Sequence, residues 1–315
     1  PRVRRQRQMC IRDSFSIVQV MIEKTLQATG NMIAPMWFQI AGVVFNFVFD
    51  PLLIFGIGPF PKMGVVGAAV ATVLGYVVST IIALIQLFLT KQKVKPVFKN
   101  CLEPQMIKLI FSYGLPSFVM NALGAFTVNF ANMFLVRYSD TAIAFFGAYF
   151  KVQQLIFMTV NGLIQGCLPI MRFNYRAKEY GRLKQANKSG TIIATVMMIV
   201  GMLLVLIFPK EILFLFSASE EMCAFGVPAM RIMSLGFVFS GFSAMIATYE
   251  QATDSIMPGV VVQLLRQGVL LVPVIWLLNS AVQMTGIWLA FPITEFVTFL
   301  VAVVFATVSY THLTL

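Results

Sequence analysis

Residues 64–89 read GVVGAAVATVLGYVVSTIIALIQLFL and contain no charged side chain. A helix crosses the hydrocarbon core of a membrane with about 20 apolar residues, because each residue adds about 1.5 Å along the helix axis. A helix on the surface of a soluble protein of this length would keep a polar face, which this stretch lacks. The stretch therefore predicts a transmembrane helix.

Similar apolar stretches follow one another along the chain, separated by short polar breaks. Hydrophobic residues make up 59% of the sequence and charged residues 11%, with a mean hydropathy of +0.86. Soluble domains carry about 25% charged residues, and the strands of a membrane barrel would be short and alternate in polarity. We therefore predict an all-α polytopic membrane protein. Its expected spans are Phe15–Leu26 (partial), Met36–Gly56, Gly64–Leu89, Ile107–Val136, Ala142–Ile170, Thr191–Phe208, Pro228–Tyr249, Val260–Leu278 and Gly286–Ala306.

Both ends of the chain carry tails that we expect to be non-native. Residues 8–14 (QMCIRDS) and 307–313 (TVSYTHL) can be back-translated into reverse-complementary DNA, and the pair resembles a transposon-end adapter used in preparing sequencing libraries. Such tails are left out of reasoning about the fold. Excluding 1–14 and 307–315 removes the only histidine, His312. The remaining part starts inside an apolar segment, so we expect it to be cut from a longer protein.

The basic residues predict which helix ends face the cytoplasm. They gather in two segments, 90–108 and 171–188, with Lys91, Lys93, Lys95, Lys99 and Lys108 in the first and Arg172, Arg176, Lys178, Arg182, Lys184 and Lys188 in the second. Cytoplasmic loops of membrane proteins are enriched in lysine and arginine. We therefore place both segments in the cytoplasm. Contact with anionic lipid is an alternative role for the same residues.

Two parts of the sequence resemble each other. LQATGN at 26–31 precedes a predicted helix near Pro35, and EQATDS at 250–255 precedes one near Pro258. Further matches keep the same order: Pro51 with Pro273, Gly64 with Gly286, and Ala68 with Ala290. Internal repeats are common in transporters, whose substrate site lies between the halves. Chance similarity between apolar helices is the alternative.

Several motifs resemble the MATE (multidrug and toxic compound extrusion) exporters, in detail their MepA-like bacterial members. LQATGN at 26–31, NxxxDPLLIFG at 46–56 and GVVGAAxAT at 64–72 resemble the family's fourth to sixth helices. The second half continues the resemblance with GLP at 114–116, QGxxP at 165–169, NYxAK at 174–178 and GIWLAxP at 286–292. The resemblance covers nearly all of residues 15–306.

The resemblance implies a truncated MATE-type fold of two helical bundles. We expect residues 15–89 to be the remainder of the N-terminal bundle (part of helix 4, then helices 5 and 6), 90–106 a cytoplasmic linker and 107–306 the C-terminal bundle (helices 7–12). About eight complete spans and one partial span of an expected twelve would then be present. Because part of the fold is missing, we expect the 315-residue chain by itself not to transport.

Asp50 is a candidate cation-coupling residue. A carboxylate inside hydrocarbon costs at least ~2.5–3.5 kcal/mol, and Asp50 lies about 9 Å inside the outer end of its predicted helix. Asn46 lies one turn earlier on the same face, and Pro51 loosens the preceding turn. A proton or Na⁺ site is one interpretation, and an Asp-Pro helix break near the membrane surface is the other. The resemblance implies the first, with Asp50, Asn46 and Thr72 as the coupling residues.

A second pair of charges lies in the last two predicted spans. Glu295 is about 14 Å inside its helix, and Arg266 lies in the preceding span. The two could form a structural ion pair, Glu295 could bind a cationic drug, or Arg266 could snorkel to the surface. Polar residues on two earlier helices either bond between helices or line a wet cavity. The candidates for the substrate cavity are Glu295, Arg266, Asn121, Asn129, Gln154, Asn161 and Gln165.

The resemblance implies an exporter of organic, often cationic, compounds that is driven by inward H⁺ or Na⁺. We expect small organic substrates and the lipid bilayer as partners, no nucleic acid, no cofactor besides the coupling ion, a monomer, and a place in the bacterial cytoplasmic (inner) membrane. A flippase for lipid-linked oligosaccharides is the alternative. A membrane enzyme is a third possibility, but the sequence contains no HExxH, GxSxG or GxxxxGK[ST] motif. Cys101, Cys167 and Cys223 have no CxxC spacing, so we expect no metal site.

Overall fold

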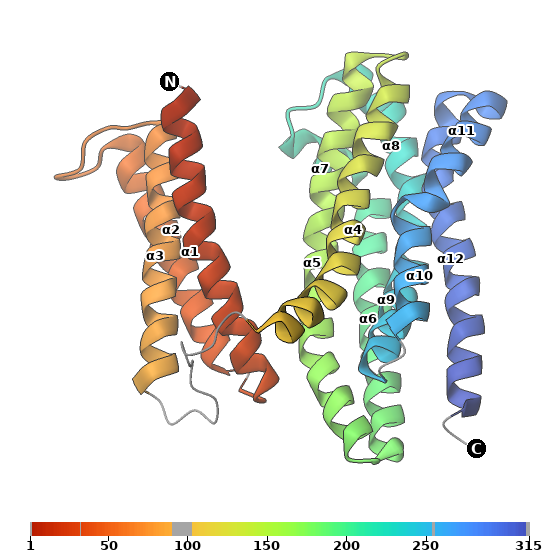
Figure 1. Cartoon of the computed structure of the whole chain (residues 1–315). Coiled ribbons are helices and arrows are strands. Elements are labelled where there is room, and N and C mark those ends of the chain that lie inside the picture. Colours follow the sequence, from red (N-terminus) through yellow and green to blue (C-terminus); the bar gives the residue numbers. More distant parts are fainter. Residues whose placement is uncertain (1, 32, 90–102, 254–255, 313–315) are drawn as a thin grey trace. The chain divides into compact units, whose positions relative to one another are not determined.

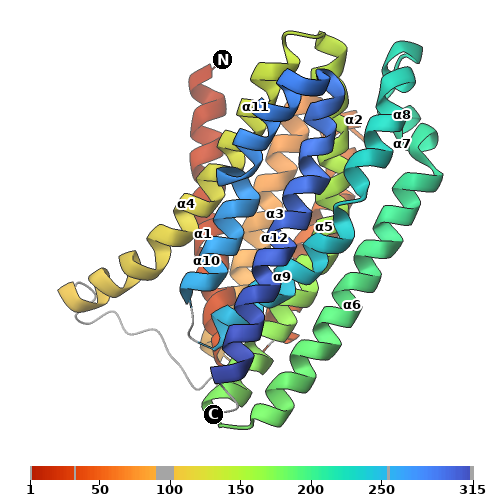
Figure 2. The same cartoon turned by 90° about the vertical axis from the view of Figure 1, so that its right-hand side faces the viewer.

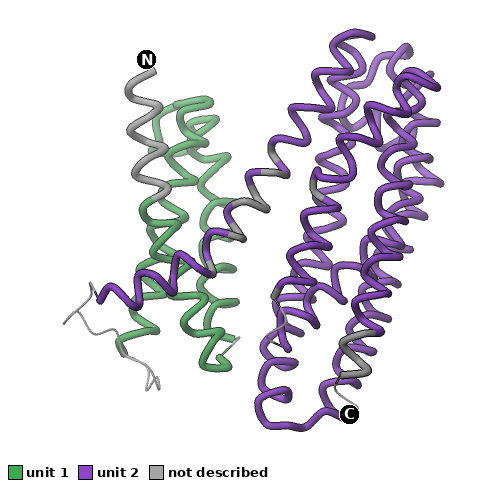
Figure 3. The backbone as a smooth tube through the Cα atoms, turned by 45° about the vertical axis from the view of Figure 1, so that its right-hand side comes forward, with its two compact units in different colours: residues 1–101 green, residues 102–315 purple. Residues whose placement is uncertain are grey.

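The computed structural model describes residues 2–31, 33–89, 103–253 and 256–312, and every regular element in these ranges is a helix (Figure 1). The chain forms two compact units, residues 1–101 and residues 102–315 (Figure 3). Helices long and apolar enough to cross a membrane occupy, within the described residues, Ile33–Phe55, Val65–Phe88, Asp140–Arg176, Tyr180–Ile207, Glu220–Ala252 and Met284–Thr307. The predicted all-α membrane fold is confirmed.

The first unit is built from α1 (Arg2–Ala28), α2 (Ile33–Phe55) and α3 (Val65–Leu89). Gly30 adopts a φ of 85° in the turn after α1. Asn31 caps α2, because its Oδ1 atom accepts a hydrogen bond from the Ala34 N–H at 3.1 Å. After α2, Gly56 takes a φ of 70°, a left-handed conformation that often ends helices because glycine adopts it at no steric cost.

Small residues bring α2 and α3 into close antiparallel contact. Gly42 lies against Ser79, and a Cβ added to Gly67 would overlap the backbone carbonyl of Leu53. The Ser79 hydroxyl also donates a hydrogen bond to the Phe38 carbonyl oxygen at 2.7 Å. Glycine at a helix contact lets two backbones approach in this way. The contact fixes which part of α3 each residue of α2 faces.

The second unit contains the remaining elements. In chain order these are α4 (Pro104–Leu135), α5 (Asp140–Arg176), α6 (Tyr180–Ile207), α7 (Pro209–Leu215), α8 (Glu220–Ser234), α9 (Phe237–Ala252), α10 (Ile256–Leu264), the π turn η1 (Leu265–Val269), α11 (Leu271–Val282) and α12 (Met284–His312). Serine side chains cap two of them: Ser139 accepts from the Ala142 N–H at the start of α5, and Ser219 accepts from the Met222 N–H at the start of α8. The buried core includes Phe145, Tyr149 and Met198.

Two predicted spans are divided between elements, and the prediction of a continuous helix is wrong for the span 260–278. The span 228–249 is divided between α8 and α9 at Leu235 and Gly236, but both residues keep right-handed helical dihedral angles, and Glu220–Ala252 is one segment long enough to cross a membrane. A Cβ on Gly236 would lie 3.2 Å from the Cα of Pro292 on α12, so the break lets two backbones approach. The span 260–278 is divided into α10, η1 and α11 (Figure 2), and Gly268 in η1 has a non-helical φ of 174°.

Several helices also extend beyond their predicted spans. Thus α6 starts at Tyr180 rather than Thr191, and α1 and α12 include residues of the expected non-native tails. The apolar pattern marks the part of a helix that lies in hydrocarbon, and a helix continues past it wherever its polar residues are solvated.

Candidate functional site

Asn46 and Asp50 lie on α2 where this helix packs against α3. A Cβ on Gly75 of α3 would lie 3.5 Å from the Cβ of Asn46, so Asn46 lies at the contact between the helices. The Oδ1 atoms of Asn46 and Asp50 are buried and have no hydrogen-bond partner among the described residues. A buried oxygen without a partner loses the free energy of its hydration. A bound proton or cation would compensate for that loss.

Thr72 lies on the facing stretch of α3. Asn46 lies opposite Gly75 and Leu53 lies opposite Gly67, so Asp50 faces the part of α3 between these two glycines. The Thr72 hydroxyl donates to the Ala68 carbonyl oxygen of its own helix at 2.8 Å. Among the described residues, no hydrogen bond joins it to Asp50. The three predicted coupling residues therefore lie along one helix pair without direct bonds between them.

The second unit contains a cavity of about 490 Å³. Residues of α4, α5, η1, α11 and α12 line it. The lining consists of Gly124, Thr127, Val128, Phe150, Gln153, Gln154, Phe157, Arg266, Leu271, Phe291 and Glu295. It thus combines apolar and aromatic side chains with two amides and two opposite charges. A pocket of this size and composition is typical of small-molecule sites.

Arg266 and Glu295 form an ion pair in the wall of this cavity. The Arg266 Nε atom donates to Glu295 Oε1 at 3.0 Å, and the two side chains are 17% and 15% exposed. The guanidinium carbon of Arg266 lies 4.9 Å from the centre of the Phe157 ring, which is a cation–π contact. Glu295 Oε2 is buried and has no hydrogen-bond partner within the described residues. The ion pair therefore satisfies only one of the two carboxylate oxygens.

Aromatic rings form much of the rest of the wall. The Phe150 and Phe291 rings meet edge to face with their centres 6.3 Å apart. Phe157 packs in the same way on Phe237, at 5.7 Å. Ring faces and edges offer contacts to flat organic molecules and, through the ring quadrupole, to organic cations.

Comparison with known proteins identifies the family. The MatE family model matches residues 116–277, which is just over half of the chain. The chain belongs to the MATE family. "Multidrug export protein MepA" of Staphylococcus aureus (strain bovine RF122 / ET3-1) is 27% identical over 283 residues, which cover 89% of this chain and 61% of that protein. The protein of the same name from Staphylococcus saprophyticus is also 27% identical, over 87% of this chain and 59% of its own length.

The MATE fold is also found in solved structures that resemble this one. A MATE crystal structure in complex with MaD3S superimposes with a TM-score of 0.85 at 19% identity, over 98% of this chain and 69% of that one. An outward-facing multidrug resistance MATE transporter of the MOP superfamily gives 0.80 at 20% identity, over 90% and 64%. The predicted resemblance to MepA-like MATE transporters is thus confirmed, and the chain spans about 60% of the length of its curated relatives. The MATE family consists of transporters rather than enzymes, and the apolar helices of this chain agree with the bacterial cytoplasmic membrane as the expected place of a multi-pass member.

The cavity of this MATE member includes some predicted residues and leaves others out. Arg266, Glu295 and Gln154 line it. Asn129, Asn161 and Gln165 have exposed side chains and are not part of the lining. Asn121 lies on α4, but its side chain is outside the described residues. The phenylalanines of the lining were not predicted, because nothing in the sequence separates them from the other phenylalanines among a total of 30.

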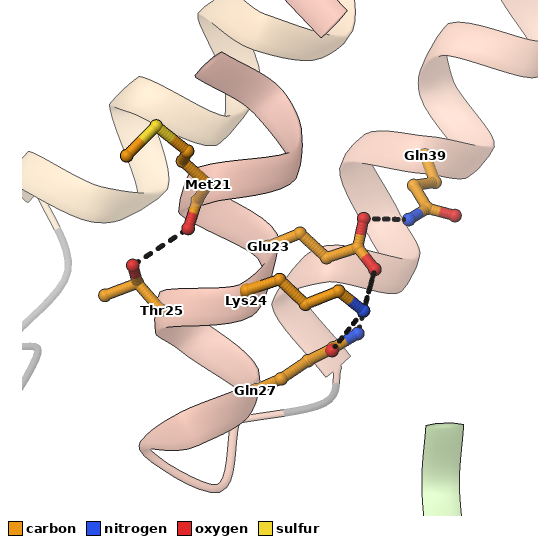
Figure 4. A network of polar contacts seen from close by, with 6 residues as sticks. All are labelled: Met21, Glu23, Lys24, Thr25, Gln27 and Gln39. Atoms are coloured by element: carbon orange, nitrogen blue, oxygen red, sulfur yellow. Dashed lines mark hydrogen bonds and ion pairs between the residues drawn. The ribbon is translucent and has the colours of Figure 1, made fainter. Parts of the chain in front are cut away.

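Glu23 is a buried acidic residue that the sequence analysis missed. Its Oε1 atom accepts a hydrogen bond from Gln27 Nε2 at 2.9 Å, and its Oε2 atom accepts one from Gln39 Nε2 at 2.7 Å (Figure 4). Lys24 Nζ lies 3.5 Å from Oε1. Both carboxylate oxygens are therefore paired, and the bond to Gln39 links α1 to α2. An acidic residue inside an apolar helix was the signal that could have revealed it.

Proposed function

We propose that the whole protein exports organic, chiefly cationic, compounds across the bacterial cytoplasmic membrane in exchange for inward H⁺ or Na⁺. The observation that carries the proposal is the cavity in the second unit, whose lining contains both aromatic rings and the Glu295 carboxylate. A buried anion with aromatic neighbours attracts an organic cation electrostatically. The name of the MepA relatives, "Multidrug export protein", supports the same conclusion.

Asp50 is the proposed coupling residue, with Asn46 and Thr72 beside it on the same helix pair. The unpartnered oxygens of Asp50 and Asn46 support this role, because a proton on the carboxylate or a bound Na⁺ would satisfy them. Since the two residues lie where α2 meets α3, ion binding would alter the packing of these helices. The ion can drive transport only if it binds the inward-open and outward-open states with different affinity.

The division into bundles completes the proposal. Residues 15–89 would belong to the N-terminal bundle and residues 107–306 to the C-terminal bundle, joined by a cytoplasmic linker at 90–106. Transport would require the substrate site to open alternately to the two sides of the membrane.

Replacing Asp50 by Asn in the whole protein tests the coupling role. We expect ethidium transport into inverted membrane vesicles to fall to background. The amide of asparagine neither binds a proton at physiological pH nor supplies a negative charge for Na⁺. Comparing ethidium transport in vesicles energised by a H⁺ gradient with that in vesicles energised by a Na⁺ gradient identifies the coupling ion. Asp140→Asn is the matched control, since Asp140 lies at the exposed start of α5. Normal efflux by the Asp50→Asn protein at normal membrane abundance would refute the coupling role.

The flippase alternative has no support in the cavity. A pyrophosphate headgroup would require several free basic residues, and within the part of the chain that the structure describes the lining contributes Arg266, already paired with Glu295.

A further inference from the structure

Arg266 already makes the two contacts that an organic cation would make in the proposed cargo cavity. Its Nε atom bonds to Glu295 at 3.0 Å, and its guanidinium carbon lies 4.9 Å from the centre of the Phe157 ring. A carboxylate and an aromatic face are the groups that attract a cation in a site of low polarity. A positive charge of the protein itself therefore occupies this part of the cavity.

We propose that Arg266 is a tethered competitor of the cargo. A monocationic cargo would bind by displacing the guanidinium from Glu295 and Phe157, and the return of Arg266 would help to expel it. This inference rests on the proposed function, because it concerns the regulation of the same cavity. Arg266 would then control both the affinity of the cavity for its cargo and the release of the cargo.

The charges of the lining explain why displacement is required. Arg266 and Glu295 are the ionisable residues of the lining, and they carry opposite charges. A cargo cation that entered without moving Arg266 would leave a net positive charge beside two side chains that are only 17% and 15% exposed, which is costly. Displacement keeps the charge of the site balanced, because the guanidinium moves away as the cargo arrives.

Glu295 offers a route for the exchange. Its Oε2 atom is buried and has no hydrogen-bond partner among the residues the structure describes, while Oε1 holds Arg266. A cargo ammonium can bind Oε2 before Arg266 leaves Oε1. The carboxylate is then never without a positive partner, which avoids the high cost of an unpaired buried charge.

The backbone around Arg266 differs from a regular α-helix. Arg266 lies in the π turn η1, where the Leu270 N–H donates to the Leu265 carbonyl oxygen at 3.2 Å. Gly268, two residues later, has a φ of 174°. The chain is therefore kinked between α10 and α11. Movement of Arg266 would act on the joint between these two helices.

Ethidium binding by the purified 315-residue chain in detergent tests the proposal without requiring transport. Arg266→Gln removes the competitor, and we expect ethidium to bind about tenfold more tightly, as it would if Arg266 occupied the site for about nine-tenths of the time. Arg266→Lys keeps the charge but loses the planar contact with Phe157, so we expect a gain of about threefold. Binding of the uncharged dye N-phenyl-1-naphthylamine should not change. Arg231→Gln, which removes an exposed arginine of α8, is the matched control.

Glu295→Gln separates the proposal from the function on which it rests. If ethidium binds this variant as it binds the wild type, the cavity is not the cation site and the proposed function fails. If Glu295→Gln weakens binding but both Arg266 variants also weaken it, the cavity remains and competition is refuted, because Arg266 then only positions Glu295. If Arg231→Gln raised the affinity for ethidium as much as Arg266→Gln does, competition would also be refuted. Should Arg266→Gln not fold, the lysine variant alone decides, since unchanged or weaker binding overturns the proposal.

Discussion

At the scale of single residues, Glu23 is a carboxylate whose role is to join helices. It accepts one amide hydrogen bond within α1 and one from Gln39 on α2. Replacing Glu23 by Ala would leave two amide donors without their acceptor. We expect a loss of about 1–3 kcal/mol in unfolding free energy, measured by thermal or denaturant unfolding of the purified chain in detergent.

Lys24→Ala is the control for this prediction. Lys24 lies 3.5 Å from the same carboxylate, but its side chain is 49% exposed. An exposed ion pair contributes about 0–1 kcal/mol, so the unfolding free energy of this variant should be close to that of the wild type. Equal stability of the Glu23→Ala protein and the wild type would mean that water replaces both amide contacts.

Charged residues in apolar segments were the predictable part of the cavity. Arg266 and Glu295 stand out because hydrocarbon tolerates few charges, and the structure pairs them. The amide residues were less informative: Gln154 lines the cavity, whereas Asn161 and Gln165 do not. A polar stripe indicates one face of a helix, but it does not reveal which neighbour covers each turn of that face. That depends on tertiary packing.

At the scale of the helices, hydropathy predicted where most helices lie but not where they break. The interruptions at Leu235–Gly236 and in Leu265–Val269 fall inside apolar stretches. The first contains no polar side chain, and the second contains Arg266 and Gln267 in the middle of an apolar segment rather than at its end. Each break instead has a glycine at a contact or a kink, and glycines are too frequent in membrane helices for this to be predicted.

The α2–α3 contact leads to a prediction about Gly67. A Cβ at this position would overlap the Leu53 carbonyl, so Gly67→Ala has to separate the two helices. We expect the unfolding free energy to fall by about 1–3 kcal/mol. Gly162→Ala on α5 is the control, because nothing lies within 4 Å of a Cβ there. Thermal unfolding in detergent measures both, and an unchanged Gly67→Ala protein would show that the contact is loose.

At the scale of the whole molecule, the family fold could be predicted because its evidence is spread over many residues. Apolar segments of spanning length and short motifs from LQATGN at 26–31 to GIWLAxP at 286–292 agree with one another. The cavity depends instead on how α4, α5, η1, α11 and α12 assemble. No local pattern encodes that arrangement.

The charge distribution predicts how the second unit is oriented in the membrane. The turn with Lys178 between α5 and α6 should face the cytoplasm, and the turn with Ser217 between α7 and α8 should face outward. In a background without native cysteines, Ser217→Cys should react with a membrane-impermeant maleimide on intact cells. Lys178→Cys should react only after permeabilisation. The reverse labelling pattern would invert the orientation.

The π turn at Leu265–Val269 also determines how one stretch of chain serves two neighbours. It contains Gly268, whose backbone is non-helical, so α10 and α11 meet at a kink instead of continuing one helix. Accordingly α10 packs chiefly on α9, whereas α11 packs chiefly on α12. Deleting one residue here would change the geometry of this kink and so disturb the contact of α11 with its present partner. A one-residue deletion in this turn should thus be more harmful than one in a loop of the same length.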